Sequence, residues 1–359
     1  MKTKIFLLFI ILPFLSQATV WRVNGKANVD AEFSTIQEAV DNASSGDTIY
    51  VEPLSEGQAY AGATIDKTLF LYGTGYYLEE NDSNQYALNE SIINPIRFNP
   101  GSEGSLLSGF VTTGTLNIPG VGSGHIILNA CCITVENCNY PVSSTSNTSF
   151  LLLFSNADNC IIRNCHYVAG RVEVQPLPSD TSEPGVTGTI IFNSIFEAVN
   201  GRSASSVTIG DLTVDHCTVR YAIGVENIPA RAKNTTFINS VISSSSISPV
   251  CSSGCTFINT MGQEAIFNGS QVDIVLSDFE DDFIPSLNEH PELRYSLSEV
   301  SAGKNAATDG TDCGLFGGPT PYRLSGIPEI PAIFQLVVDT QGNANSQTLD
   351  VNLKAKSHD

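Results

Sequence analysis

The phrases ITVENCNY at 133–140, CIIRNCHY at 160–167 and TIIFNSIF at 189–196 are three copies of one short pattern. Looser copies follow as LTVDHCTV at 212–219, TTFINSVI at 235–242 and CTFINTM at 255–261. The polar residues on which the copies align are separated by 27, 29, 23, 23 and 20 residues: Asn137, Asn164, Asn193, His216, Asn239 and Asn259. A self-similar period in this range is typical of a solenoid.

Each phrase alternates β-branched or aromatic residues with other residues and then meets Asn and a small residue. This pattern predicts a short strand that ends in a bend. The segments between phrases are rich in Gly, Ser, Asn and Pro and contain no amphipathic stretch for a crossover helix, which argues against a doubly wound sheet. We therefore expect coils of parallel strands stacked about 4.8 Å apart around a core of Ile, Val, Phe and Cys.

The recurrent Asn has a structural interpretation. Asn tolerates the left-handed conformation of a sharp corner, and its amide can bond the Asn above and below it in a stack. Cys138, Cys165 and Cys217 follow the bend and are expected to point inward as small residues.

The first 18 residues have the pattern of a signal peptide. Lys2 and Lys4 precede an apolar run from Ile5 to Leu15, and small residues around Ala18 suit cleavage before Thr19. The apolar run is too short to span a bilayer, and no later segment is apolar enough to do so. We expect a secreted, cell-surface or periplasmic protein with no membrane span in the mature chain.

Charge and cysteine content exclude several classes. Loss of Lys2 and Lys4 reduces the basic residues from 17 to 15 against 37 acidic residues, a formal charge of about −22. Such a surface repels nucleic acid and also disfavours the binding of an anionic polymer.

Nine cysteines at mostly strand positions do not suit a disulfide scaffold or a zinc site. Cys251 and Cys255 could close a small loop, whereas the adjacent Cys131 and Cys132 do not indicate a bridge to each other.

The beginning of the mature chain carries a resemblance to a known family. The stretch FSTIQEAVDNASSGDTIYVEP at 33–53 predicts a helix, with Ser34 and Gln37 as a capping box, and then a strand. With IDKTLFLYGTG at 65–75, it resembles the start of secreted right-handed parallel β-helix proteins of the pectate-lyase-like superfamily. The resemblance covers about residues 21–283 and implies an all-β, right-handed parallel β-helix with an N-terminal capping helix. It is weak for activity, because the superfamily includes lyases, hydrolases, epimerases, adhesins and proteins without known catalysis.

The pattern changes near residue 295, so we divide the mature chain into a β-helix domain at 19–295 and a Gly/Pro-rich closing part at 296–359. The phrase DGTD at 309–312 suits consecutive Asx turns and resembles the closing part of bacterial secreted β-helix proteins. Alternating residues at 334–340 and 348–355 predict a C-terminal hairpin that caps the exit of the coil.

Lyases of the resembled superfamily use a basic residue facing a uronate whose carboxylate is neutralised by calcium on outward acids. Counting back from the bends predicts one outward column of Glu136, Arg163, Phe192 and Asp215. A second column contains Asn139, His166, Ile195 and Thr218. The candidate substrate-binding residues are Glu136, Arg163, His166, Asp215 and Arg220. Glu136 and Arg163 are better explained as an exposed ion pair between neighbouring coils, and Phe192 interrupts the acids that calcium would need. We assign no catalytic residue and no metal or cofactor, and leave calcium open.

Two acidic stretches are interpreted as solvent-exposed loops without a binding role. The polar loop YYLEENDSNQYAL at 76–88 could line a sugar groove but suits a solvated excursion better. The stretch LSDFEDDF at 276–283 is expected to be a charged turn.

Two classes of function remain. The favoured one is a secreted or cell-surface β-helix that presents a face to a glycan or another surface molecule. The alternative is a polysaccharide lyase or related carbohydrate-active enzyme that uses the region of Arg163 and Asp215. A structural protein or adhesin is a third possibility.

Overall fold

The bends predicted from the repeated phrases are present at every copy. The computed structural model describes residues 18–80, 88–118, 122–141, 149–175, 186–201, 211–220, 232–233, 235–243, 251–253, 255–263, 267, 274–276, 282–283, 290–328, 332–338 and 351–356. All six bend residues have positive φ angles, between 42° and 51°. This left-handed conformation is costly for most side chains and readily adopted by Asn, so the repeated Asn sets the corner of each coil.

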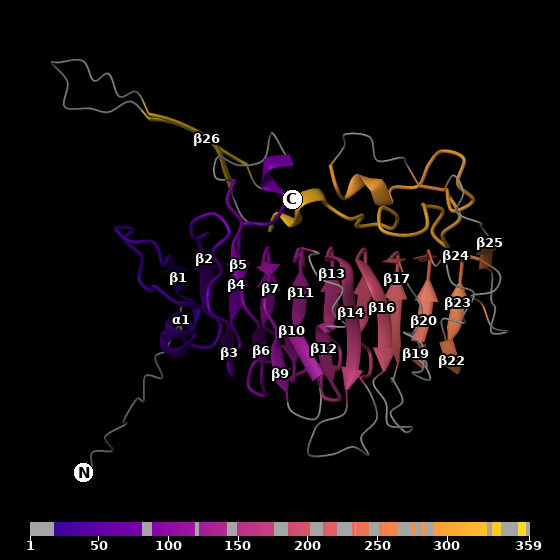
Figure 1. Ribbon diagram of the computed structural model, residues 1–359, viewed down its shortest axis with the longest axis horizontal. Helices are drawn as coiled ribbons and strands as arrows, with labels where there is room; N and C mark the ends of the chain where they lie inside the picture. Colours follow the sequence, from indigo (N-terminus) through magenta and orange to yellow (C-terminus); the bar gives the residue numbers. More distant parts are fainter. Residues whose placement is uncertain are drawn as a thin grey trace, which may run out of the picture.

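The strands before the bends form one parallel sheet, and the strands after them contribute to a second (Figure 1). The first sheet has ten strands: β1 (Val20–Val23), β2 (Thr48–Val51), β4 (Phe70–Tyr72), β7 (Leu106–Ser108), β11 (Thr134–Glu136), β13 (Ile161–Arg163), β15 (Ile190–Phe192), β17 (Leu212–Asp215), β20 (Thr235–Ile238) and β23 (Thr256–Ile258). Its strands follow one another in chain order and pair in parallel, so the predicted all-β parallel β-helix is confirmed.

The second sheet has eleven strands. Ten are stacked in order: β3 (Ala63–Ile65), β6 (Ile96–Phe98), β10 (Gly122–Leu128), β12 (Ser149–Phe154), β14 (His166–Gln175), β16 (Ile195–Gly201), β18 (Thr218–Val219), β21 (Val241–Ile242), β24 (Thr260–Gly262) and β25 (Ile274–Leu276). The eleventh, β9 (Leu116–Ile118), pairs antiparallel with β10. Two short parallel pairs accompany the sheets: β5 (Ile92–Ile93) with β8 (Val111–Thr112), and β19 (Ala232–Lys233) with β22 (Cys251–Ser253).

Continuous files of apolar side chains fill the coil. One file crosses nine coils of the first sheet, and all its members are buried: Ile49, Leu71, Leu107, Val135, Ile162, Ile191, Val214, Phe237 and Phe257. The last two rings stack with centroids 5.3 Å apart. Cys138, Cys165 and Cys217 are also fully buried, as the sequence predicted. Because equivalent strand positions pack on one another from coil to coil, the apolar core is buried inside the coil itself, and no separate layer of helices or strands is needed to cover it.

The predicted helix covers the first coils. Helix α1 (Ile36–Asn42) contacts β1, β2 and β3 and buries Ile36, Ala39 and Val40. Its cap differs from the prediction, since Thr35 and Glu38 form the capping box in place of Ser34 and Gln37. The chain therefore enters the helix one residue later than the Ser-x-x-Gln pattern suggested. The expected signal peptide lies almost wholly outside the described residues, of which the first is Ala18.

After the last coil the chain reverses and runs back along the outside of the stack (Figure 1). We call residues 290–328 the return segment; it contains the 3-10 turns η3 (Leu293–Tyr295) and η4 (Leu324–Gly326). From Ala306 onward the segment meets the coils in inverted order: Ala306 lies at Asn259, Leu315 at Asn193, and Ser325 at Tyr76 near η1 (Leu78–Glu80). Its first residues run the other way, since His290 packs against Tyr77 and Tyr295 against His166. Asp309 accepts from the backbone of Thr311, which confirms an Asx turn in the DGTD phrase.

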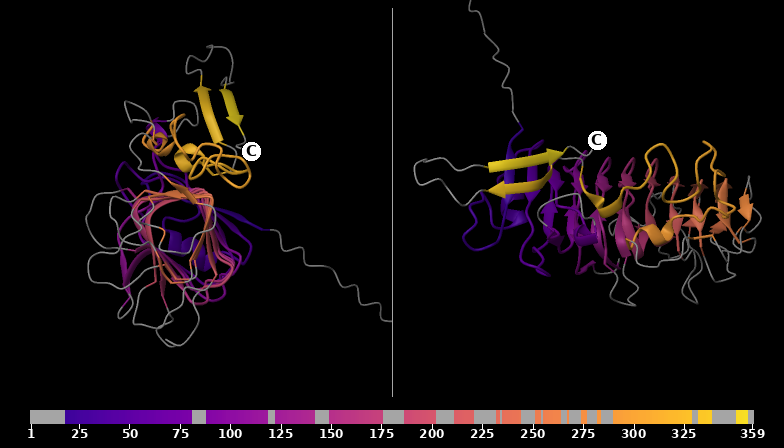
Figure 2. Two further views of the ribbon diagram at one scale, coloured as in Figure 1. Left: turned by 90° about the vertical axis from the view of Figure 1, so that its right-hand side faces the viewer. Right: turned by 90° about the horizontal axis from the view of Figure 1, so that it is seen from above.

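The C-terminal hairpin is present but does not cap the exit of the coil. Strands β26 (Ala332–Val338) and β27 (Val351–Lys356) pair antiparallel. In Figure 2 the left view shows them outside the stack, and the right view shows them over the early coils. The position predicted for the hairpin is wrong because the return segment has already carried the chain to Tyr76 by Ser325. The few residues from there to β26 cannot reach back to β25, since a residue extends at most about 3.6 Å.

Candidate functional site

The register of the coils confirms both predicted columns. Glu136, Arg163, Phe192 and Asp215 are successive partners in the first sheet. Asn139, His166, Ile195 and Thr218 are successive partners on the next face. The alternation of the strands was therefore read correctly from the sequence. The side chains in those columns form ion pairs and hydrogen bonds with one another and with neighbouring residues, and this arrangement differs from that of a catalytic site.

Arg163 is engaged with Glu136 on the coil before it. The Arg163 Nε atom donates to Glu136 Oε2 at 2.6 Å, and Nη2 lies at the same distance from that oxygen. The Glu136 side chain is only 5% exposed, while that of Arg163 is 35% exposed. A buried carboxylate needs a cation, so this guanidinium serves to neutralise Glu136 and is not poised to take a proton from a substrate.

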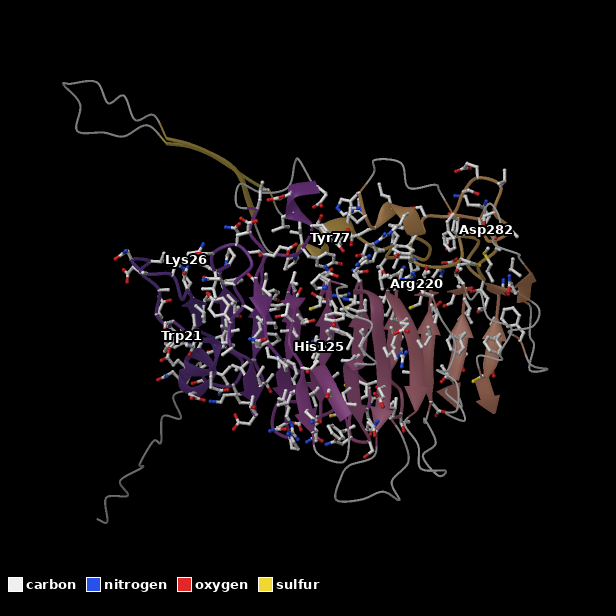
Figure 3. The ribbon with its side chains drawn as sticks, viewed as in Figure 1. Trp21, Lys26, Tyr77, His125, Arg220 and Asp282 are labelled. Atoms are coloured by element: carbon white, nitrogen blue, oxygen red, sulfur yellow. The ribbon has the colours of Figure 1, made fainter. Side chains whose placement is uncertain are left out.

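Asp215 and Arg220 make contacts of their own. Asp215 Oδ1 lies 2.8 Å from Nδ1 of His216 and accepts from Asn239 Nδ2 at 3.2 Å. Arg220 Nη1 donates to the carbonyl of Val168 at 3.0 Å. Figure 3 labels Arg220 and Tyr77, which both lie along the side of the stack that the return segment covers. These candidates thus form local pairs and contacts with neighbouring residues.

His166 points out of the coil but is buried, which corrects the expectation of an accessible outer face. It is 1% exposed because the rings of Tyr76, Tyr77 and Tyr295 surround it at centroid distances of 6.2, 5.5 and 6.0 Å. Its Nδ1 pairs with Asn139 Oδ1 at 3.2 Å. Burial lowers the pKa of His166 to about 3, so the ring is neutral. The alternation along a strand predicts which side chains point away from the core. It does not predict which of these side chains another segment of the chain covers.

Three of the bend residues, Asn193, Asn239 and Asn259, bond the return segment, contrary to the expected amide ladder between coils. Asn193 Nδ2 donates to the carbonyls of Leu315 and Gly317 at 3.0 and 2.8 Å. Asn239 accepts from the backbone of Thr308 at 2.7 Å, and Asn259 donates to the carbonyl of Ala306 at 2.8 Å. These bends are therefore structural, as predicted, but their amides recognise backbone far along the chain.

A buried polar network, which the sequence did not indicate, joins the two ends of the return segment beside Tyr76. Glu292 is fully buried and accepts from the Tyr322 hydroxyl and, at 2.7 Å, from the Ser325 backbone. The Tyr322 hydroxyl also meets that of Tyr76 at 2.5 Å. Burial raises the pKa of Glu292 to about 8 even though these donors favour its charged form.

The same network places a hydroxyl, an imidazole and a carboxylate in a row. Ser325 Oγ lies 3.1 Å from His290 Nε2, and His290 Nδ1 lies 3.2 Å from Glu292 Oε2. The order matches a nucleophile, a base and an orienting acid. Ser325 is nevertheless fully buried, and its own N–H is bonded to the carboxylate. We therefore interpret the row as hydrogen bonding that docks the segment onto Tyr77, whose carbonyl accepts from Ser325 Oγ at 3.2 Å.

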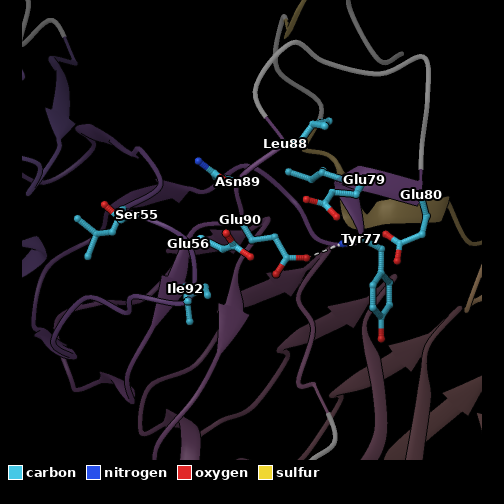
Figure 4. Close-up of a pocket in the computed structure, with 12 residues that line it drawn as sticks. Ser55, Glu56, Tyr77, Glu79, Glu80, Leu88, Asn89, Glu90 and Ile92 are labelled. Atoms are coloured by element: carbon cyan, nitrogen blue, oxygen red, sulfur yellow. Dashed lines mark hydrogen bonds between the residues drawn. The ribbon is translucent and has the colours of Figure 1, made fainter.

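A pocket opens beside η1, at the start of the polar loop (Figure 4). Its volume is about 320 Å³, and it is lined by Leu54, Ser55, Glu56, Gly57, Tyr77, Leu78, Glu79, Glu80, Leu88, Asn89, Glu90 and Ile92. Glu90 accepts from the Tyr77 backbone at 2.6 Å, and burial together with Glu80 and Glu79 raises its pKa.

The Tyr77 ring does not provide a stacking platform in this pocket. Figure 4 shows it directed away from Leu88 and Asn89. It packs edge-on against His166 and His290, at 5.5 and 5.9 Å between ring centroids. The part of the loop at 81–87 lies outside the described residues. The described lining is apolar at Leu54, Leu88 and Ile92 and otherwise rich in carboxylates.

The described ranges contain neither a metal-binding cluster nor a membrane-spanning helix. There, no three or more His, Cys, Asp or Glu side chains are grouped to hold a metal ion. Most of the predicted acidic turn at 276–283 lies outside those ranges. No helix among the described residues has the length and hydropathy needed to cross a bilayer.

The sequence matches no protein-family model and no curated protein. Among solved structures, it is similar to a pectin methylesterase mutant in complex with a hexasaccharide. The identity is 10%, the match covers 73% of this chain and 72% of that chain, and the TM-score is 0.21. A score this low supports no argument from one chain to the other, so the strand pairing of this chain is what establishes its fold.

Proposed function

We propose that this protein is a secreted or cell-surface β-helix that binds a glycan or another surface molecule through the pocket beside η1. The observation that carries the proposal is the pocket itself. Its 320 Å³ volume is at the lower end of the range for small-ligand sites and suits one or two sugar units. Carboxylates accept hydrogen bonds from hydroxyl or ammonium groups, and the apolar residues can contact the faces of a sugar ring.

The charge of the pocket indicates the ligand class. Glu56, Glu79, Glu80 and Glu90 all line it, and no described basic side chain does. A uronate polymer would be repelled here in the absence of cations, whereas a neutral or amine-bearing glycan would not. The lyase alternative is supported less well, because Arg163 is paired with Glu136 and Asp215 with His216.

Titration calorimetry with three oligosaccharide series tests the proposal: neutral glucose oligomers, glucosamine oligomers and galacturonate oligomers. We expect the neutral or the amine-bearing series to bind and the galacturonate series not to bind. Glu79→Gln and Glu90→Gln should each weaken binding roughly 10- to 100-fold, the value of a hydrogen bond to a charged group. Gln at position 90 retains an acceptor for the Tyr77 backbone.

The matched control is Glu299→Gln, which removes one negative charge from a side chain that is 93% exposed and does not line the pocket. It should leave the affinity unchanged. No binding in any series would refute a glycan ligand, and binding that both pocket variants retain in full would refute this site. If uronate polymers instead acquire unsaturated ends, and Arg163→Ala abolishes that activity, the lyase alternative is correct.

A further inference from the structure

Two adjacent thiols meet at a surface corner between β10 and β11. The Sγ atoms of Cys131 and Cys132 are 3.1 Å apart. Cys132 is exposed and Cys131 is partly exposed, and both are free thiols. Cys132 has a φ of 61°, a left-handed conformation that is uncommon for cysteine. Adjacency in the sequence did not predict a link between these residues, but the folded corner brings their sulfur atoms into contact.

The neighbouring coil holds this corner in place. The Cys132 backbone donates to the carbonyl of Asp158 at 2.8 Å, and Asn156 Nδ2 donates to the carbonyl of Asn129 at 2.8 Å. Cys160 lies beneath, with its Sγ 3.6 Å from the carbonyl of Ala130. Because backbone on both sides of the pair is anchored, the two thiols stay together in the absence of a covalent bond.

The other described thiols are in a different environment. Cys138, Cys160, Cys165, Cys217 and Cys313 are all buried. Burial raises the pKa of Cys160 and of Cys165 to about 12, which leaves almost no reactive thiolate. Among the described free cysteines, Cys131 and Cys132 are therefore the pair that solvent reagents reach.

The protein also contains an oxidised cysteine, since Cys255 is disulfide-bonded. Its expected partner Cys251 has a side chain outside the described part of the chain. A structural disulfide suits the oxidising exterior that is expected from the N-terminal sequence and that the proposed function assumes. In such an environment two exposed thiols in contact meet small-molecule disulfides.

We propose that Cys131 and Cys132 are a vicinal redox site, which closes to a disulfide by exchange with a small-molecule disulfide and reopens under mild reduction. The Cys132 thiolate attacks one sulfur of the reagent, forming a mixed disulfide and releasing one reagent thiolate. Cys131 then loses its proton and attacks Cys132 Sγ, which closes the ring and releases the second reagent thiolate. Two protons leave the protein, and the reagent takes up the two electrons.

The closed form is expected to be easily reduced. Neighbouring Cα atoms across a trans peptide are about 3.8 Å apart, below the usual range of about 4.4–6.8 Å for bridged cysteines. The resulting strain favours the dithiol, and strained, exposed disulfides are the labile ones. The contact with Cys132 raises the pKa of Cys131 to about 11, so ring closure should accelerate with rising pH.

The test is to incubate the purified full chain with oxidised glutathione, to alkylate free thiols, and to analyse the peptide containing both cysteines by mass spectrometry. We expect it to be lighter by two hydrogen atoms and unalkylated. Low concentrations of dithiothreitol should then make both cysteines alkylatable before Cys255. Phenylarsine oxide, a reagent for paired thiols, should bind the reduced protein at this peptide.

The single variants separate the two steps. Cys131→Ser should accumulate a stable glutathione adduct on Cys132, whereas the parent protein resolves it. Cys313→Ser, which removes a buried thiol, should behave as the parent. A persistent glutathione adduct on Cys132 in the parent protein would overturn the proposal. So would full alkylation of both cysteines after oxidation, or reduction of Cys255 before this pair.

Discussion

The bend residue Asn193 allows the docking of the return segment to be tested against the stability of the coil itself. Asn193 has a φ of 42° and is 2% exposed, and its amide donates to the carbonyls of Leu315 and Gly317. Asn193→Gly keeps the positive φ without strain and removes both hydrogen bonds. The backbone corner should survive while the contact to the return segment is lost.

The magnitude follows from the two bonds. Each neutral hydrogen bond contributes about 0.5–1.5 kcal/mol, and the carbonyls left behind are buried under the segment, which increases the cost. We expect the docked state of the return segment to lose about 2–3 kcal/mol. That corresponds to roughly 30- to 150-fold more frequent opening.

Hydrogen–deuterium exchange measures that opening directly. The amides of Gly314, Gly317 and Gly318 are hydrogen-bonded in the docked segment and should exchange faster in Asn193→Gly. The control is Asn137→Gly, at a bend with a φ of 51° whose amide donates to Ser108 within the coils. Unchanged protection of these three amides in Asn193→Gly would refute the reasoning. Equal loss of protection in both variants would also refute it, because the effect would then arise from the coil.

Two further predictions concern buried charge. The folded-state pKa of Glu292, about 8, lies above its ordinary value of 4.5, so the folded protein binds the extra proton between these values. Its contribution to the free energy of unfolding is complete below about pH 4.5 and falls as the pH rises through about 8. Urea unfolding over this range should show a steeper decline for the parent than for Glu292→Gln, and coincident profiles would contradict the assignment. Arg163→Ala should lower the free energy of unfolding by about 1–2 kcal/mol, because Glu136 is then left buried without its cation. The partial exposure of Arg163 keeps the loss below that of a deeply buried pair. A urea midpoint unchanged by Arg163→Ala would show that the pair contributes nothing.

The sequence predicted the elements whose causes are local. A strand that ends in Asn and a small residue recurs, and the left-handed bend that Asn permits appears at all six copies, including the one occupied by His216. The period of two along each strand then fixed which residues enter the core and which leave it, down to the register of Glu136 with Arg163 and of Phe192 with Asp215. Helix α1 was predictable for the same reason, although its cap moved from Ser34 to Thr35.

The tertiary structure decided what covers the coil. The return segment meets residues of the coils that lie from 40 to 248 positions away, such as Leu315 at Asn193 and Ser325 at Tyr77. Contacts of that separation leave no periodic trace in the sequence, so His166 was expected at an outer face and is buried. The pocket carboxylates and the Cys131–Cys132 contact also depend on how loops are placed by the coils beneath them. Short-range periodicity therefore determined the cylinder, and only long-range packing determined which of its surfaces remain available for chemistry.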